Sequence, residues 1–563
     1  MILQKKPHKT QRKRGETAYS LLAHYRYRLM IRKNDKHDLK LFNKLYQRYV
    51  VDQAIKIDNN NLKYVANNKQ TQKNIAKYSE LRDTVRTKPS EIGHIKPGVM
   101  PASHIGSEKH FRQLYYNVLH LTSEIGYPPT LFITMTANPK WPEIVAQLKK
   151  GQHAYDHPDI VSRVFKMKLD ALIKDLTKDM ALGCCVARVH VIEFQKRGLP
   201  HAHIIIWLEK KDIPQTEKEW EQIVCAELPP QGDPLRELIG GNMVHGPCCD
   251  KRCLENGKCK KGFPQQLLEE SEFDEHGIIQ IKRPKLDPSK GFRKKVRVDK
   301  AMKEINFLNC DVVQYNPALC RKYWCHINVV PVRNSMSALK YLYGYNFKGA
   351  DAGTIVFLDK DNNEFDRHIS GRVTTPPSAC WSIFSYPMSC IYPPVQEVYL
   401  HLPNEQPVTI PHDATKEQLE KLKRAPPTSQ LMGFFNLNAM RFNGLDNEAE
   451  KTNDLYYEDV SSYYTWHADK EQWNQRINIP AHQTLTRMTW YDSSCGELFF
   501  LRLLLKNIPN PTSFDELKVD PRDSNVVYPS FREACRERNL LDDDTIWIVM
   551  LDNAAICYKA SVI

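Results

Sequence analysis

The sequence predicts an α+β fold built on an antiparallel sheet, and three observations support it. Segments 186–194 and 201–208 have the length and apolar composition of β-strands, and Lys196-Arg197-Gly198 lies between them. A three-residue hairpin loop favours glycine at its left-handed last position. Segment 131–137 also has strand character, and segment 159–180 carries apolar residues at helical spacing. Helices and a hairpin in this arrangement are typical of helices packed on one antiparallel sheet.

The chain is too long for one hydrophobic core, since it has 563 residues. Proline-rich stretches and charge runs indicate where its parts meet. We expect a mainly helical N-terminal region, a sheet domain with a cysteine-bearing insertion, and a mixed C-terminal extension. The expected boundaries are a basic arm at 1–14, the helical region at 15–128, the sheet domain at 129–350 with its insertion at 209–310, a linker at 351–394 and the extension at 395–563.

Charge and cysteine content narrow the class of protein. The formal net charge is +14, which favours an anionic partner. The N-terminal arm is either a solvated tail or a nuclear-localisation or nucleic-acid-binding segment. No apolar run has the length of a signal peptide or a membrane span, so we expect a soluble intracellular protein, nuclear in a eukaryotic host, without a membrane partner. Its fifteen cysteines are then expected to be reduced.

A divalent-metal site is predicted on the second strand of the hairpin. His201 and His203 are two residues apart, so both side chains point to one face of a strand. An odd-length loop places Glu193 opposite His201, which makes Glu193 the expected third ligand, with Gln195 as the substitute. Imidazole and carboxylate ligands suit Mg²⁺ or Mn²⁺. The alternative is a pair of structural histidines, and His326 is expected to be a core residue beside this site.

Two tyrosines form a second candidate group. Tyr341 and Tyr345 are four residues apart in a segment with helical character, so they would be neighbours on one helix face. A phenol can attack a phosphodiester when its phenolate is stabilised. The alternative is an aromatic stripe in the core, and Gly344 between the two tyrosines would weaken a helix by roughly 1 kcal/mol.

The insertion contains a candidate zinc site. Zinc in structural sites takes four Cys or His ligands in a tetrahedron. The preferred set is His245, Cys248, Cys253 and Cys259, with Cys249 as the spare ligand. The spacing is irregular compared with paired Cys-x-x-Cys motifs, so a loop of reduced cysteines is the alternative.

Several basic residues are candidates for contact with a nucleic-acid backbone. They lie at the hairpin loop, in the basic stretch 290–300 and after the second tyrosine. The alternative is that these charges simply face water. The candidates are Lys196, Arg197, Arg293, Lys294, Lys295 and Lys348.

Taken in order, these motifs resemble the replication-initiator region of Helitron rolling-circle transposases. The resemblance covers most of residues 15–350 and continues weakly beyond them. The segments that carry it are Phe132-Ile-Thr-Met-Thr-Ala-Asn-Pro-Lys-Trp-Pro-Glu-Ile144, Arg163-Val-Phe-Lys166, Ile192-Glu-Phe-Gln-Lys-Arg-Gly-Leu-Pro-His-Ala-His203, Tyr315-Asn-Pro317, His326-Ile-Asn-Val329 and Lys340-Tyr-Leu-Tyr-Gly-Tyr345.

The resemblance implies that 129–350 is a His-hydrophobic-His endonuclease domain, with Ala202 as the apolar residue. In that family, a divalent ion is held by the residues matching His201 and His203. The tyrosines matching Tyr341 and Tyr345 join to the 5′ phosphate of single-stranded DNA at transposon ends, leaving a free 3′ hydroxyl. Gly344 departs from the family pattern, which usually has a larger residue there.

No Gly-x-x-x-x-Gly-Lys-Ser/Thr motif occurs in the sequence, so we expect no ATPase in this chain. The family's helicase would then be supplied in trans, and a truncated element copy or partial gene is expected. Two other hypotheses remain. The chain is a catalytically inactive DNA-binding remnant or host-adopted fragment, or it is a zinc-dependent hydrolase whose tyrosines are structural.

Overall fold

A computed structural model describes most of the chain. The described residues are 20–30, 38–67, 73–83, 104–194, 198–248, 253–275, 277–298, 301–332, 368, 373–411, 414–443, 454–477 and 484–541. Within these ranges, none of the helices is long and apolar enough to cross a membrane.

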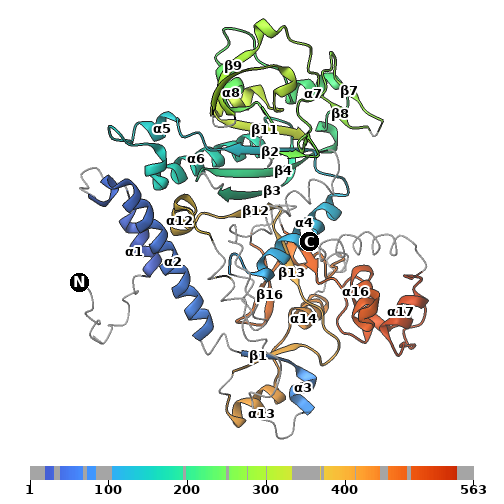
Figure 1. The fold of residues 1–563 in the computed structure, drawn as a ribbon. Helices are drawn as coiled ribbons and strands as arrows, with labels where there is room; N and C mark the ends of the chain where they lie inside the picture. Colours follow the sequence, from blue (N-terminus) through green and yellow to red (C-terminus); the bar gives the residue numbers. More distant parts are fainter. Residues whose placement is uncertain are drawn as a thin grey trace.

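A five-stranded sheet is at the centre of the part that the sequence predicts to be a sheet domain (Figure 1). Its strand order is β11-β2-β4-β3-β12, and every neighbouring pair is antiparallel. The predicted α+β class and the antiparallel sheet are confirmed. The strands are β2 (Leu131–Thr136), β3 (Cys185–Phe194), β4 (Pro200–Leu208), β11 (His326–Pro331) and β12 (Ser389–Tyr392).

The β3–β4 hairpin has the register that the sequence predicts. Phe194 pairs with Pro200 and Glu193 pairs with His201. Gly198 has φ of +80°, the left-handed conformation expected at the end of the loop. Residues 195–197 lie outside the described residues, but the pairing on either side requires an odd-length connection.

Helices cover both faces of the sheet. On one face, α6 (Pro158–Thr177) packs its apolar side, including Phe165 and Leu172, on alternate residues of β2 and β4. On the other, α4 (Glu108–Ile125) contributes Val118 and Leu121 to a smaller cluster with Trp207. The apolar side chains of these strands therefore divide between two separate cores, as the alternation of side chains requires.

Part of the expected linker belongs to the sheet domain. Residues 376–392 supply α12 (Pro376–Ile383) and the edge strand β12, which pairs with β3. α12 packs on both α6 and the long N-terminal helix α2 (Asn43–Asn67). Trp381 is fully buried there, with its ring centroid 6.0 Å from that of Phe165 and 5.9 Å from that of Phe194. The apolar run after the two prolines explains why this segment folds onto the domain.

The insertion forms the upper part of Figure 1, next to the edge strand β11. It consists of short helices and two-stranded hairpins, and its apolar residues continue the core beneath α6. Its elements are α7 (Glu217–Ile223), α8 (Leu235–Asn242), β5 (Leu254–Glu255), β6 (Lys258–Cys259), β7 (Glu272–Phe273), β8 (Ile279–Gln280), β9 (Phe292–Val298) and β10 (Ala301–Phe307), followed by α9 (Pro317–Tyr323).

The C-terminal extension has a hydrophobic core of its own. The helix expected near 496–507 is present as α16 (Glu497–Asn507). The other elements of this region are β13 (Val395–Val398), β14 (Pro407–Pro411), α13 (Lys416–Arg424), α14 (Gln430–Asn443), α15 (Val460–Tyr463), β15 (Tyr464–His467), β16 (Gln472–Gln475), β17 (Leu485–Met488) and α17 (Phe531–Glu537).

The N-terminal region is mainly helical, as predicted. It also contributes β1 (Lys73–Lys77), which pairs with β14 and so joins the N-terminal region to the C-terminal extension. Other elements of the N-terminal region are α1 (Leu21–Arg28) and α3 (Tyr78–Asp83), which follows β1. The sheet domain also contains the short helix α5 (Pro142–Val145).

The burial of Trp381 gives a stability prediction. Trp381→Ala removes a fully buried side chain that joins α12 to α6, so it is expected to destabilise the sheet domain by about 3–5 kcal/mol. Met167→Ala, on the exposed side of α6, is the control and should leave stability unchanged. Urea unfolding of both variants measures this. An unchanged midpoint for Trp381→Ala would mean that residues 376–392 do not form part of this domain.

Candidate functional site

Polar side chains line up across four strands of the sheet. The backbone pairings connect His326 to Thr136, Thr136 to His201 and His201 to Glu193, which forms one row from β11 to β3. Directly paired residues point to the same face. This row lies on the same face of the sheet as the apolar cluster that packs on α4. The polar groups are at the end of that face beyond the apolar residues.

A second row lies two residues along each strand and faces the same way. In it, His203 pairs with Thr134 on one side and with Val191 on the other. His201 and His203 are both buried, with 7% and 4% of their surface exposed, and their ring planes are parallel with centroids 6.2 Å apart. The strand spacing predicted from His-x-His is therefore confirmed, and both imidazoles share one face.

Two threonines of β2 orient the imidazoles. Thr136 Oγ1 lies 2.8 Å from Nδ1 of His201, and Thr134 Oγ1 lies 3.2 Å from Nδ1 of His203. When Nδ1 of His201 donates to Thr136, Nε2 keeps its lone pair. Metal-binding histidines usually have such a second partner on the nitrogen that does not bind the ion. The threonines therefore leave the Nε2 atom of each ring on the side away from β2's hydroxyl groups.

Glu193 meets the second histidine rather than the first. Its Oε2 lies 3.1 Å from Nε2 of His203. Without an ion, the Nε2–H of His203 donates to this carboxylate. The same separation suits two neighbouring ligands of an octahedral ion, because bonds of about 2.1 Å at right angles place their ends about 3 Å apart. Glu193 and His203 can therefore hold either a proton or a metal ion between them.

His201 has a ring nitrogen, Nε2, that could bind a metal ion. Its Nε2 is buried and has no hydrogen-bond partner. Burial, together with the nearby rings of His203 and His326, lowers the pKa of His201 to about 3, so this imidazole is neutral and available as a ligand. Because the rings of His201 and His203 stand parallel, one of them has to turn before both bind a single ion.

His326 lies beside this group, as the sequence predicted. It belongs to the same row as His201, and its Nδ1 is buried without a hydrogen-bond partner. Burial lowers its pKa to about 4. It is separated from His201 by a whole strand, or roughly 10 Å of backbone. Glu193, on the adjacent strand, is therefore the better third ligand.

Sequence reasoning did not assign a role to Thr134 and Thr136. The available signal was their spacing, since two hydroxyls in alternate positions of a buried strand need partners. The strand that would provide those partners could not be identified from the sequence alone.

The candidate DNA-binding residues are only partly described. On β9, Arg293 and Lys295 are exposed on one side of the strand together with Arg297. Lys294 points the other way, where its ammonium donates to the carbonyl of Gly241 and burial lowers its pKa. It is therefore less available to an external phosphate. Gln195, Lys196, Arg197, Tyr341, Tyr345 and Lys348 lie outside the described residues.

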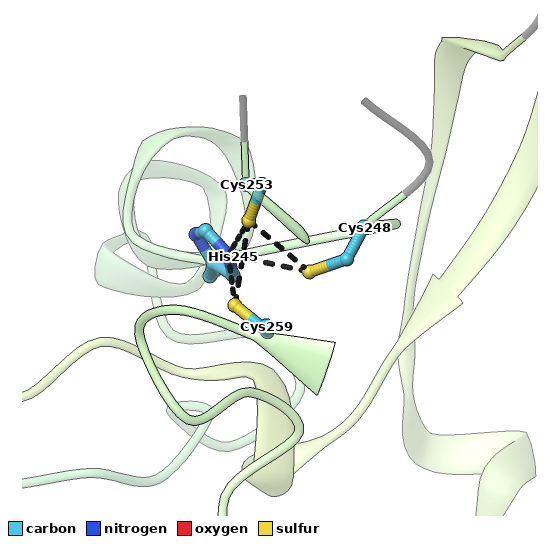
Figure 2. A group of neighbouring side chains, drawn as sticks. All are labelled: His245, Cys248, Cys253 and Cys259. Atoms are coloured by element: carbon cyan, nitrogen blue, oxygen red, sulfur yellow. Dashed lines mark hydrogen bonds between the residues drawn. The ribbon is translucent and has the colours of Figure 1, made fainter. Parts of the chain in front are cut away.

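The candidate zinc ligands converge on one point. Figure 2 shows the imidazole of His245 and the sulfurs of Cys248, Cys253 and Cys259 pointing toward a common centre. Among the described residues, these four form one of the groups whose ligand atoms lie close enough together to hold a metal ion. The spare candidate, Cys249, lies outside the described residues.

Residues 24–206 match the family model of the Helitron helicase-like domain at N-terminus. This part of the chain is a Helitron helicase-like N-terminal region. The match covers about a third of the chain, and it includes β2, α6, β3 and both histidines of β4. No curated protein matches the chain. The match ends within β4, before the insertion and the two tyrosines.

The low pKa values of His201 and His326 predict acid sensitivity in the absence of added Mg²⁺ or Mn²⁺. Because these pKa values lie below the ordinary histidine value of about 6.5, the unfolded chain binds protons more readily than the folded chain. Stability is therefore expected to fall as the pH decreases from about 6.5 toward about 3. His201→Gln should reduce this dependence in urea unfolding at several pH values. An equally steep dependence in His201→Gln would contradict the buried neutral imidazole.

Proposed function

We propose that this chain is a metal-dependent tyrosine endonuclease and strand transferase acting on single-stranded DNA. The observation that carries the proposal is the sheet face that His201, His203 and Glu193 share, on which the Glu193 carboxylate lies 3.1 Å from Nε2 of His203 and Nε2 of His201 is buried without a hydrogen-bond partner. The relation to Helitron transposases supports the substrate class, since the matched region contains all three residues. We propose nuclear action at transposon ends, with a helicase supplied in trans.

The donor set fits Mg²⁺ or Mn²⁺. A buried imidazole nitrogen without a partner, a second imidazole and a half-buried carboxylate give two neutral ligands and one anion. When bound, the ion would supply electrostatic stabilisation of the phosphate under attack. Thr134 and Thr136 hold the rings in position, and burial keeps His201 unprotonated, so the protein maintains this set across the physiological pH range.

The covalent step is assigned to Tyr341 and Tyr345 from the sequence. The phenolic oxygen forms a bond to phosphorus while the bond between phosphorus and the 3′ oxygen breaks. The phenol loses its proton, and the departing oxygen gains one to become a free 3′ hydroxyl. The phosphotyrosine conserves the energy of the broken bond, so attack by another 3′ hydroxyl rejoins a strand. A second tyrosine permits a second such transfer.

Surface features near the sheet are compatible with a single strand of DNA. Trp324 is 39% exposed and lies two residues before β11 begins at His326, so it is at the same end of the sheet as His326 and His201. Bases stack on exposed aromatic rings regardless of sequence. Arg293, Lys295 and Arg297 offer positive charge on the exposed side of β9, which suits contacts with phosphates.

A covalent-trapping assay tests the proposal. Purified protein is mixed with Mn²⁺ and 3′-labelled single-stranded oligonucleotides, including the parent element's ends, and separated on a denaturing gel. We expect label on the protein band. The adduct should be lost in Tyr341→Phe/Tyr345→Phe and reduced at least about 100-fold in His201→Ala, because electrostatic stabilisation is usually a dominant catalytic contribution.

His190→Gln is the matched control for the histidine variant. His190 is buried on the same sheet but alternates to the opposite face, so its replacement should preserve the adduct. Cleavage without an adduct would replace the proposal with metal-dependent hydrolysis, in which the tyrosines are structural. Binding of the element's ends without cleavage would indicate an inactive DNA-binding remnant.

A further inference from the structure

We propose that His245, Cys248, Cys253 and Cys259 bind a structural zinc ion that fixes the cysteine loop of the insertion against the segment leading to β11. This site is separate from the candidate nuclease site and uses none of its residues. It would hold its ion through four protein ligands, the arrangement of a structural rather than a catalytic zinc centre.

The distances among the four ligand atoms support a tetrahedral ion. Nε2 of His245 lies 3.1 Å from the sulfur of Cys253, 3.2 Å from that of Cys259 and 3.4 Å from that of Cys248. The sulfur of Cys253 lies 3.3 Å from that of Cys259 and 3.5 Å from that of Cys248. Zinc–sulfur bonds of about 2.3 Å at tetrahedral angles place two sulfurs about 3.8 Å apart. The atoms form a compact tetrahedron close to that size (Figure 2).

The backbone around Cys259 is arranged to stabilise a thiolate. The N–H of Lys261 donates to the Cys259 sulfur across 3.4 Å, and Gly262 has φ of +72°, which allows the chain to curl around that sulfur. Thiolate is the form that binds zinc, and an N–H donor on the sulfur favours that form.

His245 is held in place from two sides. Its backbone N–H donates to the carbonyl of Asp311 across 2.8 Å, and its ring lies against Phe263 with centroids 4.6 Å apart. These contacts leave Nε2 directed at the three sulfurs. The imidazole is thus positioned before an ion binds, as expected of a built ligand site.

The loop would depend on the zinc ion for its conformation, because it has short strands and little buried surface to stabilise it. β5 and β6 are two residues each, and most residues from 254 to 262 are exposed. Both ends of the loop join the segment before α9: Val244 pairs with Val312, and the N–H of Gln265 donates to the carbonyl of Cys310. Arg283, itself buried, donates to the carbonyls of Asn309 and Val312 and so anchors that segment.

Metal analysis and cobalt substitution test the zinc site. The full chain, purified without chelator, is expected to contain one tightly held zinc ion that a thiol-modifying reagent releases. Replacement by Co²⁺ should give the visible bands of a tetrahedral site and a sulfur-to-cobalt charge-transfer band. Cys253→Ser should weaken the affinity for zinc more than about 100-fold, since even the loss of a supporting partner costs roughly 10–100-fold.

Two controls separate this proposal from the nuclease. Cys310→Ser changes a half-buried thiol of the same region and should retain the ion. The double variant His201→Ala/His203→Ala should also retain it, whatever happens to nicking. Wild-type protein without zinc, an octahedral cobalt spectrum, or a disulfide between two of the three cysteines would overturn the proposal, and none of these readouts depends on the variants folding.

Discussion

The register of the β3–β4 hairpin is the constraint on which the candidate site depends. It pairs Glu193 with His201 and directs both histidines to the same face as the carboxylate. A slip of one residue would turn the histidines into the core beneath α6 and bring Ala202 to the site. Gly198, with φ of +80°, lies in the odd-length connection between Phe194 and Pro200 that this pairing requires. The chemistry proposed for the chain thus rests on one loop length.

The candidate site also depends on the burial of its two histidine rings and on the hydrogen-bond partners of their Nδ1 atoms. His201 and His203 are almost fully buried, and each has a threonine on Nδ1 from the neighbouring strand. Burial disfavours the charged imidazole, while the threonines satisfy the nitrogen that faces away from the ligand position. The cost of an unpaired buried nitrogen on His201 would be offset when an ion binds.

The sequence allowed prediction of features set by local rules and missed those set by distant partners. The strands, α6, the hairpin register and the four candidate zinc ligands follow from spacing, glycine placement and residue type. The roles of Thr134 and Thr136 depend on β2 lying beside β4, which no local pattern indicates. Residues 376–392 were expected to be a linker because of their prolines, yet the apolar surface of Trp381 folds them onto α6 and adds β12 to the sheet.

Electron paramagnetic resonance of Mn²⁺ at limiting ion concentration tests the central claim most directly, since it counts bound ions without requiring DNA or turnover. The zinc-loaded chain and His190→Gln should each bind one Mn²⁺. Glu193→Gln should bind it more weakly, and His201→Ala/His203→Ala should leave the ion free in solution. Undiminished Mn²⁺ binding by the folded double variant would contradict the account, because the ion would then be held by other residues.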